Sequence, residues 1–490
     1  MRKSVSAPVG ALIVVGIRWT DRLIGLASTM ILARLLAPED FGVIAMASLL
    51  IGLIDVLLDM GVNITLVQNK HATQDDYDAA WTLRLIQSGL ATVIIFLAAH
   101  PAAAYFHDPR VSNVVQAMAL SVLFAGFSNI GTVTFQKKME FGLEFRFFFF
   151  KRISSFLITM ATAWYLRSYW ALVIGTVGAR LVGVVLSYAM HPMRPRLSLV
   201  SMRKMLAFSS WNLLRGISNY LAENLHSLLV GRRESTAVMG SYTLACEIAA
   251  MPSIELLAPL NRVLFPLFVA ARDDAQELKR IFMLALAVQA LLGVPAGTGL
   301  ALVAHEVVLA LLGERWMAAA PFIQIMGGIN IVSALSTSGA YVLLAMGRAR
   351  ITALHSWGQV LMFMLLALLL IPAGGAMAIA LIRLGVAVTG LFTFIYLIRR
   401  EKPSWLLMDV FTFVWRPCAA SLLMAVALLG LPAMPGLPVT AMLLLKTTLG
   451  ALVYAASVLA LWQMAGRPAG AERYLVGKFM SLRKGSAGLV

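Results

Sequence analysis

Long apolar stretches run along the whole chain and are separated by short segments that carry charge, glycine and proline. A helix of about 20 apolar residues crosses the hydrocarbon core of a bilayer. The pattern therefore predicts an all-α integral membrane protein with about 14 transmembrane helices. The predicted ranges are 10–33, 41–62, 83–105, 112–134, 150–167, 169–190, 206–231, 237–269, 281–304, 318–343, 351–371, 374–398, 410–431 and 440–464.

The composition supports the membrane prediction and narrows the function. Apolar residues make up 60% of the 490 residues, and charged residues only 13%. A soluble domain carries roughly a quarter charged residues and avoids large exposed apolar patches. Because the connections between the predicted helices are short, little chain is left for a soluble catalytic domain. We therefore expect a protein that is not an enzyme.

The net charge of +17 is explained first by topology. Bases collect in the cytoplasmic loops of membrane proteins. With the N-terminus inside, only six bases fall in outside connections: Arg34, Arg110, Arg167, Arg232, Arg233 and Arg315. This asymmetry predicts a multi-pass protein with an even number of helices and both termini in the cytoplasm. The basicity then indicates no nucleic-acid partner, and the basic tail is expected to lie on anionic membrane lipid.

An internal repeat with an offset near 200 residues is visible in two places. Arg180 and Arg383 stand in similar contexts, and the stretch 38–43 has a counterpart in 237–242. The repeat predicts two pseudo-symmetric six-helix lobes, at 1–198 and 199–402. Two additional transmembrane helices would follow over 403–466, and a basic cytoplasmic tail over 467–490. In transporters built from repeats, the substrate binds near the midplane between the repeats.

Charged residues inside the predicted helices are the most informative feature. Each costs about 2.5–3.5 kcal/mol at the centre of a helix in lipid, so these residues must face each other or a hydrated cavity. The bases are Arg18, Arg22, Arg180, Arg215, Arg262, Arg383 and Lys446. The acids are Asp21, Asp55, Asp59, Glu223, Glu247 and Glu255. Structural ion pairs between helices and a basic cavity between two lobes both remain open.

If a cavity exists, the arginines in it favour an anionic ligand. The arginine fork binds phosphate oxygens bidentately. We therefore predict that the six arginines bind a diphosphate and that the six acids are candidates for ion coupling. The two cysteines, Cys246 and Cys418, lie in apolar stretches, and the histidines are scattered. We predict neither a metal site nor a cofactor.

Several short motifs resemble the polysaccharide transporter family, the O-antigen and exopolysaccharide flippases of the multidrug/oligosaccharidyl-lipid/polysaccharide exporter superfamily. Residues 31–42, ILARLLAPEDFG, are similar to the family signature ARLLGPEDFG and depart from it at Ala37. Residues 58–61 resemble its DLG turn, and residues 312–316 its LLGxxW. The stretches 229–232, 240–242 and 263–266 resemble its LIGR…GxY…VLFP block. At Asn224-Leu225-His226 the chain departs from the NLD of many relatives.

The resemblance implies two six-helix lobes that open alternately to each side. It also implies a flippase for an undecaprenyl-diphosphate-linked oligosaccharide, with Arg18 contacting the diphosphate. A polysaccharide polymerase and a chain-length regulator are further expected partners. Two alternatives remain: a multidrug or cation antiporter of the same superfamily, and a membrane-embedded polymerase or glycosyltransferase. The basic bias of the charges at membrane depth disfavours cationic drugs, and the sparse acids of the outside connections disfavour an enzyme.

Overall fold

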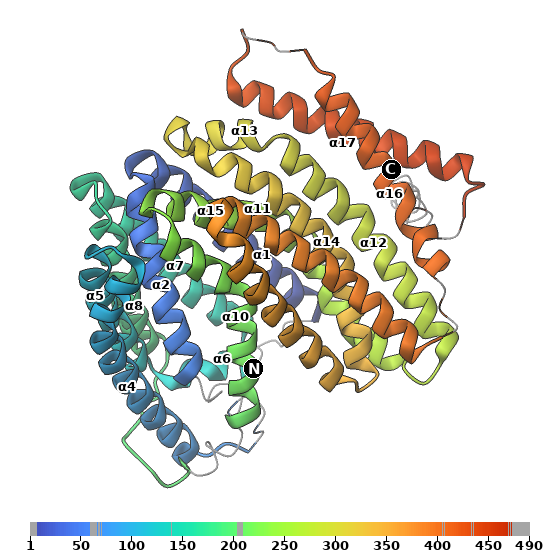
Figure 1. Ribbon diagram of the computed structural model, residues 1–490. Helices are drawn as coiled ribbons and strands as arrows, with labels where there is room; N and C mark the ends of the chain where they lie inside the picture. The colour runs from blue at the N-terminus through green and yellow to red at the C-terminus, as the bar shows by residue number, and fades with distance from the viewer. Residues whose placement is uncertain are drawn as a thin grey trace, which may run out of the picture. The chain divides into compact units, whose positions relative to one another are not determined.

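The computed structural model describes residues 7–58, 66, 69, 71–138, 140–202, 209–403, 405, 407–432, 434, 436–468, 470 and 472. Within these ranges every regular element is a helix (Figure 1). The chain forms two compact units, Met1–Thr243 and Leu244–Val490. Each unit is described separately below.

In the first unit, long helices pack both on their neighbours in the sequence and on helices far away in the sequence. Helix α4 packs on α5, α7 on both α1 and α8, and α2 on α10. The elements are α1 (Ala7–Leu35), α2 (Pro38–Leu58), α4 (Gln74–Phe106), α5 (Arg110–Gly126), α6 (Val133–Lys137), α7 (Phe141–Leu166), α8 (Trp170–Met190), α10 (Ser209–Arg233) and the beginning of α11 (Thr236–Ala270).

In the second unit, α12 packs on both α14 and α16, and α16 packs on α17. The elements after α11 are α12 (Ala275–Leu302), α13 (Ala304–Val307), α14 (Ala320–Ala345), α15 (Ala349–Glu401), α16 (Leu407–Leu429) and α17 (Val439–Met464). Helix α15 is two helices joined at Gly375, whose φ of 57° and ψ of −149° are not helical. We call them the first arm (349–370) and the second arm (374–401).

Nine helices in the described part of the chain are long and apolar enough to cross a membrane, or ten if the bent pair 110–126 and 130–137 is one span. Each of the 14 predicted ranges overlaps a helix. Because only nine or ten of these described helices meet the criteria for a membrane span, the total of 14 remains a prediction. Among the described residues, α1, α7, α10 and α11 do not meet the same criteria of length and hydropathy.

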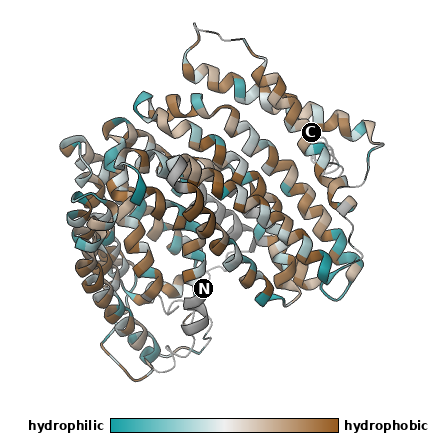
Figure 2. Ribbon diagram, viewed as in Figure 1, coloured by the Kyte–Doolittle hydropathy of each residue, from teal (hydrophilic) through white to brown (hydrophobic). Residues whose placement is uncertain are grey.

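The surface of the helices supports a membrane environment. Figure 2 shows hydrophobic residues along most of the described helices. Large apolar side chains are widely exposed, including Leu97 (72%), Leu368 (76%) and Leu452 (68%). Soluble monomers avoid such continuous exposed apolar surface, whereas lipid tails cover it. The chain is therefore a multi-pass membrane protein.

The signature stretch 31–42 has a structural role at the junction of α1 and α2. Pro38 is the first residue of α2, a position where a proline costs no hydrogen bond. The Asp40 carboxylate accepts hydrogen bonds from the backbone N–H of Ala37 (2.9 Å) and of Tyr169 (2.9 Å). Asp40 therefore joins the beginning of α2 to the beginning of α8.

The beginnings of α2 and α11 cross in close contact. A Cβ atom at Gly42 would lie 1.9 Å from the carbonyl oxygen of Thr236, and one at Gly240 would lie 1.9 Å from the carbonyl oxygen of Pro38. Pro38 and Thr236 are the first residues of their helices, and each glycine follows four residues later. The crossing therefore matches Gly42 with Gly240, one residue away from the alignment proposed from sequence.

Candidate functional site

Eight of the twelve predicted site residues have described side chains. The side chains of Arg18, Arg215 and Arg262 lie outside the described part of the chain, and so does the whole of Asp59. In the first unit the described residues are Asp21, Arg22, Asp55, Arg180 and Glu223. In the second they are Glu247, Glu255 and Arg383.

Asp21 on α1 forms an ion pair with Arg152 on α7. Arg152 Nε lies 3.1 Å from Asp21 Oδ1, and both side chains are partly exposed. Gly25, one turn after Asp21, leaves space for this arginine, since a Cβ atom there would lie 2.6 Å from Arg152 Nη2. The ion-pair alternative therefore applies to Asp21. Its partner, Arg152, is not among the predicted site residues.

Three bases from three helices lie close together in the first unit. Lys151 on α7 interacts electrostatically with Arg180 on α8 and with Arg84 on α4. Its side chain packs against Gly183, where a Cβ atom would lie 3.3 Å from Lys151 Cε. Arg180 is exposed. We call Arg84, Lys151 and Arg180 the basic cluster; of these, the sequence had singled out only Arg180 as a site residue.

Asp55 and Glu223 lie on the packed pair α2 and α10, and both are exposed. Between the two helices, the Tyr220 hydroxyl donates a hydrogen bond to the backbone carbonyl of Leu49, and Asp55 interacts electrostatically with Tyr220. Gly52 allows this packing because a Cβ atom there would meet the Tyr220 ring at 3.1 Å. The carboxylates of Asp55 and Glu223 are therefore accessible, and the hydrogen bond between Tyr220 and Leu49 holds their two helices together.

Arg383 on the second arm of α15 has an unusual environment for a guanidinium. Its Nη1 lies 3.3 Å from the sulfur of Met326 and 3.7 Å from the thiol sulfur of Cys246. Within the described residues, no carboxylate pairs with Arg383. The residue stands nine positions into a 28-residue candidate span, or about 14 Å along the helix axis. A partly exposed positive charge therefore lies deep in the predicted membrane region, and its contacts with described side chains are to two sulfur atoms, which are weak acceptors.

A buried polar network in the second unit was missed from sequence. Ser338 on α14 donates a hydrogen bond of 2.6 Å to Gln289 on α12, and both side chains are fully buried. Gln289 in turn lies 3.4 Å from the Asn261 side chain of α11. Serine, glutamine and asparagine give no charge signal, so this link between three helices becomes visible only when they are packed together.

Two ion pairs of the second unit involve residues outside the predicted diphosphate and ion-coupling sites. Lys446, one of the bases predicted at membrane depth, forms an ion pair with Glu306, and both side chains are mostly buried. Arg416 on α16 pairs with Glu472 at 2.8 Å, and only 2% and 4% of these side chains are exposed. The basic tail is therefore joined to α16 through one of its acids.

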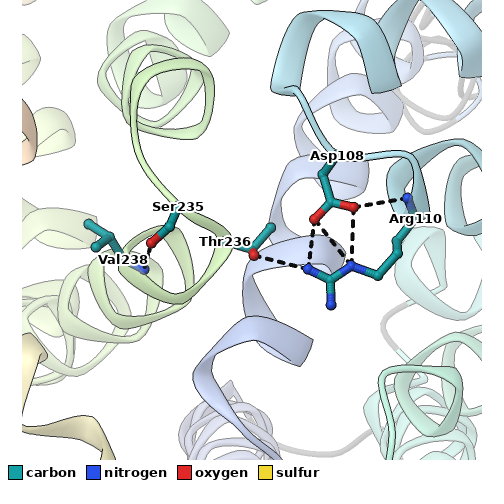
Figure 3. A network of polar contacts seen from close by, with 5 residues as sticks. All are labelled: Asp108, Arg110, Ser235, Thr236 and Val238. Carbon is teal, nitrogen blue, oxygen red and sulfur yellow. Dashed lines mark hydrogen bonds and ion pairs between the residues drawn. The ribbon is translucent and has the colours of Figure 1, made fainter.

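Figure 3 shows a polar network beside the crossing of α2 and α11. The Asp108 carboxylate binds Arg110 through both its guanidinium (2.7 Å) and its backbone N–H (2.9 Å). The same guanidinium donates to the Thr236 hydroxyl at 3.1 Å, and Ser235 accepts from the Val238 N–H at 3.4 Å. Burial raises the pKa of Asp108, but the hydrogen bonds and charge of Arg110 outweigh this and hold its pKa below the usual value.

No group of three or more metal-ligating side chains occurs within the ranges that the structure describes. The two cysteines form no disulfide: Cys246 lies beside Arg383, and Cys418 lies on α16. The arrangement of charges instead offers bases to an anion, at Arg383 in one unit and at the basic cluster in the other.

Comparison with known families decides the broad identity. Residues 31–321 match the sequence profile described as "Polysaccharide biosynthesis protein", which is more than half of the chain. The chain belongs to this family. The matched segment includes the signature at 31–42, the crossing of α2 and α11, and Arg180. Arg383 lies beyond it.

Relatives of this polysaccharide biosynthesis protein come from different bacteria. It is 25% identical to the "Lipopolysaccharide biosynthesis protein WzxC" of Escherichia coli, over 67% of this chain and 68% of that protein. It is 23% identical to the "Teichuronic acid biosynthesis protein TuaB" of Bacillus subtilis, over 66% and 68%. It is 24% identical to the "Succinoglycan biosynthesis transport protein ExoT" of Rhizobium meliloti, over 60% of each chain.

Two solved structures have folds similar to that of this chain. The lipid II flippase MurJ aligns with a TM-score of 0.76 at 10% identity, over 93% of this chain and 100% of that one. An inward-facing multidrug transporter of the MATE family aligns with a TM-score of 0.61 at 12% identity, over 79% and 96%. At these identities the likeness concerns the fold alone. Together, the family match and the fold show a membrane protein of polysaccharide biosynthesis with a fold like that of these two transporters.

Proposed function

We propose that this protein translocates an undecaprenyl-diphosphate-linked oligosaccharide, an O-antigen or exopolysaccharide repeat unit, across the bacterial inner membrane by alternating access. The observation that carries the proposal is the environment of Arg383, a guanidinium at membrane depth whose described contacts are two sulfur atoms. The names of the relatives, which refer to lipopolysaccharide, teichuronic acid and succinoglycan, support a saccharide polymer as the end product.

The guanidinium of Arg383 has more hydrogen-bond donors than its described contacts use. A guanidinium has five N–H donors, whereas a thioether or thiol sulfur is a weak acceptor. A charge placed in this way costs about 2.5–3.5 kcal/mol in lipid. A diphosphate supplies the acceptors that the sulfurs lack, in a geometry that the planar fork binds bidentately. Arg383 would therefore bind the head group of the substrate.

The other parts of the proposal rest on accessible charges. The basic cluster is a second place where a phosphate can bind, because three bases that repel one another are stabilised by an anion. Asp55, Glu223 and Glu247 are exposed acids that a proton or cation can neutralise during an ion-coupled cycle. Both termini would face the cytoplasm. A polysaccharide polymerase and a chain-length regulator would use the translocated lipid.

The thiol beside Arg383 allows a direct test of diphosphate binding. The chain has two cysteines, so Cys418→Ser leaves Cys246 as the single target for a maleimide. We expect undecaprenyl diphosphate to slow the labelling of Cys246 at least fivefold, because the bound head group would cover the thiol. Undecaprenol, which has the same chain without the phosphates, should leave the rate unchanged.

Two substitutions complete this design. Arg383→Gln should remove the protection, while Arg399→Gln, an exposed arginine on the same arm, should retain it. In cells that depend on the protein, Arg383→Gln should cause lipid-linked repeat units to accumulate on the cytoplasmic face. Equal protection by the alcohol and the diphosphate, or normal polysaccharide in cells with Arg383→Gln, would remove Arg383 from the binding site.

A further inference from the structure

The two arms of α15 enclose a groove that the proposed function does not use. The groove has a volume of about 660 Å³, within the range of roughly 300–1,000 Å³ typical of small-molecule sites. It is lined by residues 351–362 of the first arm and 389–401 of the second. Both arms are candidate membrane spans, so the groove lies within the predicted membrane region.

Glycine keeps part of the groove open. Gly358 lines the groove and is exposed, and a Cβ atom built on it would meet no atom within 4 Å. On the opposite arm, Gly390 allows the Gln359 amide to approach closely, since a Cβ atom there would lie 1.8 Å from Gln359 Nε2. The space beside Gly358 therefore exists because this residue has no side chain.

The polar side chains in the groove are satisfied by one another or by backbone. Gln359 donates to the His355 ring at 2.9 Å, and the His355 ring packs on Phe394 with centroids 3.8 Å apart. The hydroxyls of Thr389 and Thr393 donate to backbone carbonyls one turn earlier, at 2.9 Å and 2.8 Å. These groups have little need of a polar ligand, so the walls suit a hydrocarbon chain.

The mouth of the groove is basic. Arg400 is exposed and lines the groove at this end. The neighbouring Glu401 is held by Arg348 at 2.9 Å, which neutralises its charge locally. Arg350 adds exposed positive charge at the beginning of the first arm. By the positive-inside rule these ends face the cytoplasm.

We propose that this groove binds one anionic phospholipid of the inner leaflet. One acyl chain would lie against Ile351, Leu354, Met362 and Leu397, and the phosphate would contact Arg400. An apolar channel with a basic mouth fits an amphipathic anion better than a soluble one, because each end of the ligand finds a matching environment. The inference does not depend on the transported substrate.

Native mass spectrometry of the full-length protein in detergent provides the test. We expect one molecule of phosphatidylglycerol to be retained, and phosphatidylcholine with the same chains to be retained at least fivefold less. Gly358→Leu should reduce the occupancy at least fivefold, because its side chain enters the groove. Arg400→Gln should abolish the preference for the anionic lipid. Millimolar inorganic phosphate should not displace the lipid.

Matched controls separate the groove from general effects. Gly385→Leu changes an exposed glycine on the second arm that also has free space but does not line the groove. Arg399→Gln removes a neighbouring charge that lines a different, small apolar pocket. Both should bind like the unchanged protein. The proposal is wrong if Gly358→Leu and Gly385→Leu retain equal lipid, if phosphate alone competes, or if only a prenyl diphosphate binds.

Discussion

Gly42 and Gly240 are reciprocal partners in one helix crossing. Each makes room for the first carbonyl of the opposite helix, at the same distance of 1.9 Å from where a Cβ atom would stand. The carbonyls belong to Thr236 and Pro38, which begin α11 and α2. The crossing is therefore symmetric in geometry although the flanking residues differ.

Adding a methyl group at this crossing should destabilise the protein. We expect Gly42→Ala to lower the unfolding temperature in detergent by several degrees, because overpacking typically costs about 1–3 kcal/mol. Gly240→Ala should act in the same way. Gly89→Ala is the control, because that glycine of α4 has free space and alanine favours a helix.

The double variant tests the reciprocity. Once one methyl group has separated the helices, the second finds space, so Gly42→Ala with Gly240→Ala should cost clearly less than the sum of the two single changes. Additive losses of unfolding temperature would contradict the shared crossing.

The buried pair of Arg416 and Glu472 should make the attachment of the tail sensitive to single substitutions. Arg416→Met should destabilise the protein by about 3–5 kcal/mol, because it leaves a buried carboxylate without its partner. Replacing both residues by methionine should recover most of this loss. Thermal unfolding of the three variants measures it, with Arg280→Gln as control, since Arg280 pairs with Glu277 on the surface. The pair is not as described if the double variant is no better than the single one.

The network of Asp108 and Arg110 predicts a pH dependence. Burial opposes ionisation of Asp108, but Arg110 outweighs it and lowers its pKa in the folded protein. The stabilisation is therefore present above the unfolded pKa of about 3.9 and is lost as the pH falls through the lower folded value. Unfolding temperatures measured from pH 7 down to pH 3 should fall more steeply for the unchanged protein than for Asp108→Asn. Parallel curves for the two proteins would contradict this assignment.

The break in α15 depends on Gly375. Its φ of 57° with ψ of −149° belongs to a region of backbone space that is almost restricted to glycine. Gly375→Ala should therefore cost about 1–3 kcal/mol and lower the unfolding temperature. Gly385→Ala, in the helical part of the second arm, should be neutral or stabilising. An equal effect of the two substitutions would show that the turn adopts another conformation.

Much of the secondary structure could be predicted because the hydrophobic pattern is local. The ranges 351–371 and 374–398, for example, match the two arms of α15 within a few residues. Their turn could be placed because the apolar pattern pauses at Pro372, Gly374 and Gly375. Helices that carry charged residues along their length, such as α10, are less apolar and are harder to recognise as membrane spans. The partners of these charges lie on other helices, so the neighbouring sequence does not reveal them.

The candidate site could be predicted only as a set of residue types. Asp21 and Arg383 look alike in sequence, as charges inside apolar helices, yet Asp21 pairs with Arg152 and Arg383 lies between sulfur atoms. The difference depends on which helix packs beside each residue. Arg152 and Arg84 are not among the predicted site residues, because their interactions with Asp21 and Lys151 form only when the helices pack.

The sequence alone determined that this chain crosses a membrane many times, that it belongs with the polysaccharide transporters, and which types of charge it carries at depth, because these properties depend on hydropathy and on short motifs. The tertiary structure decided which charges are paired, which glycines allow close contact, and where a groove is left open. These outcomes depend on contacts between residues far apart in the chain, such as Arg416 and Glu472 or Gly42 and Thr236, which form only when the helices pack.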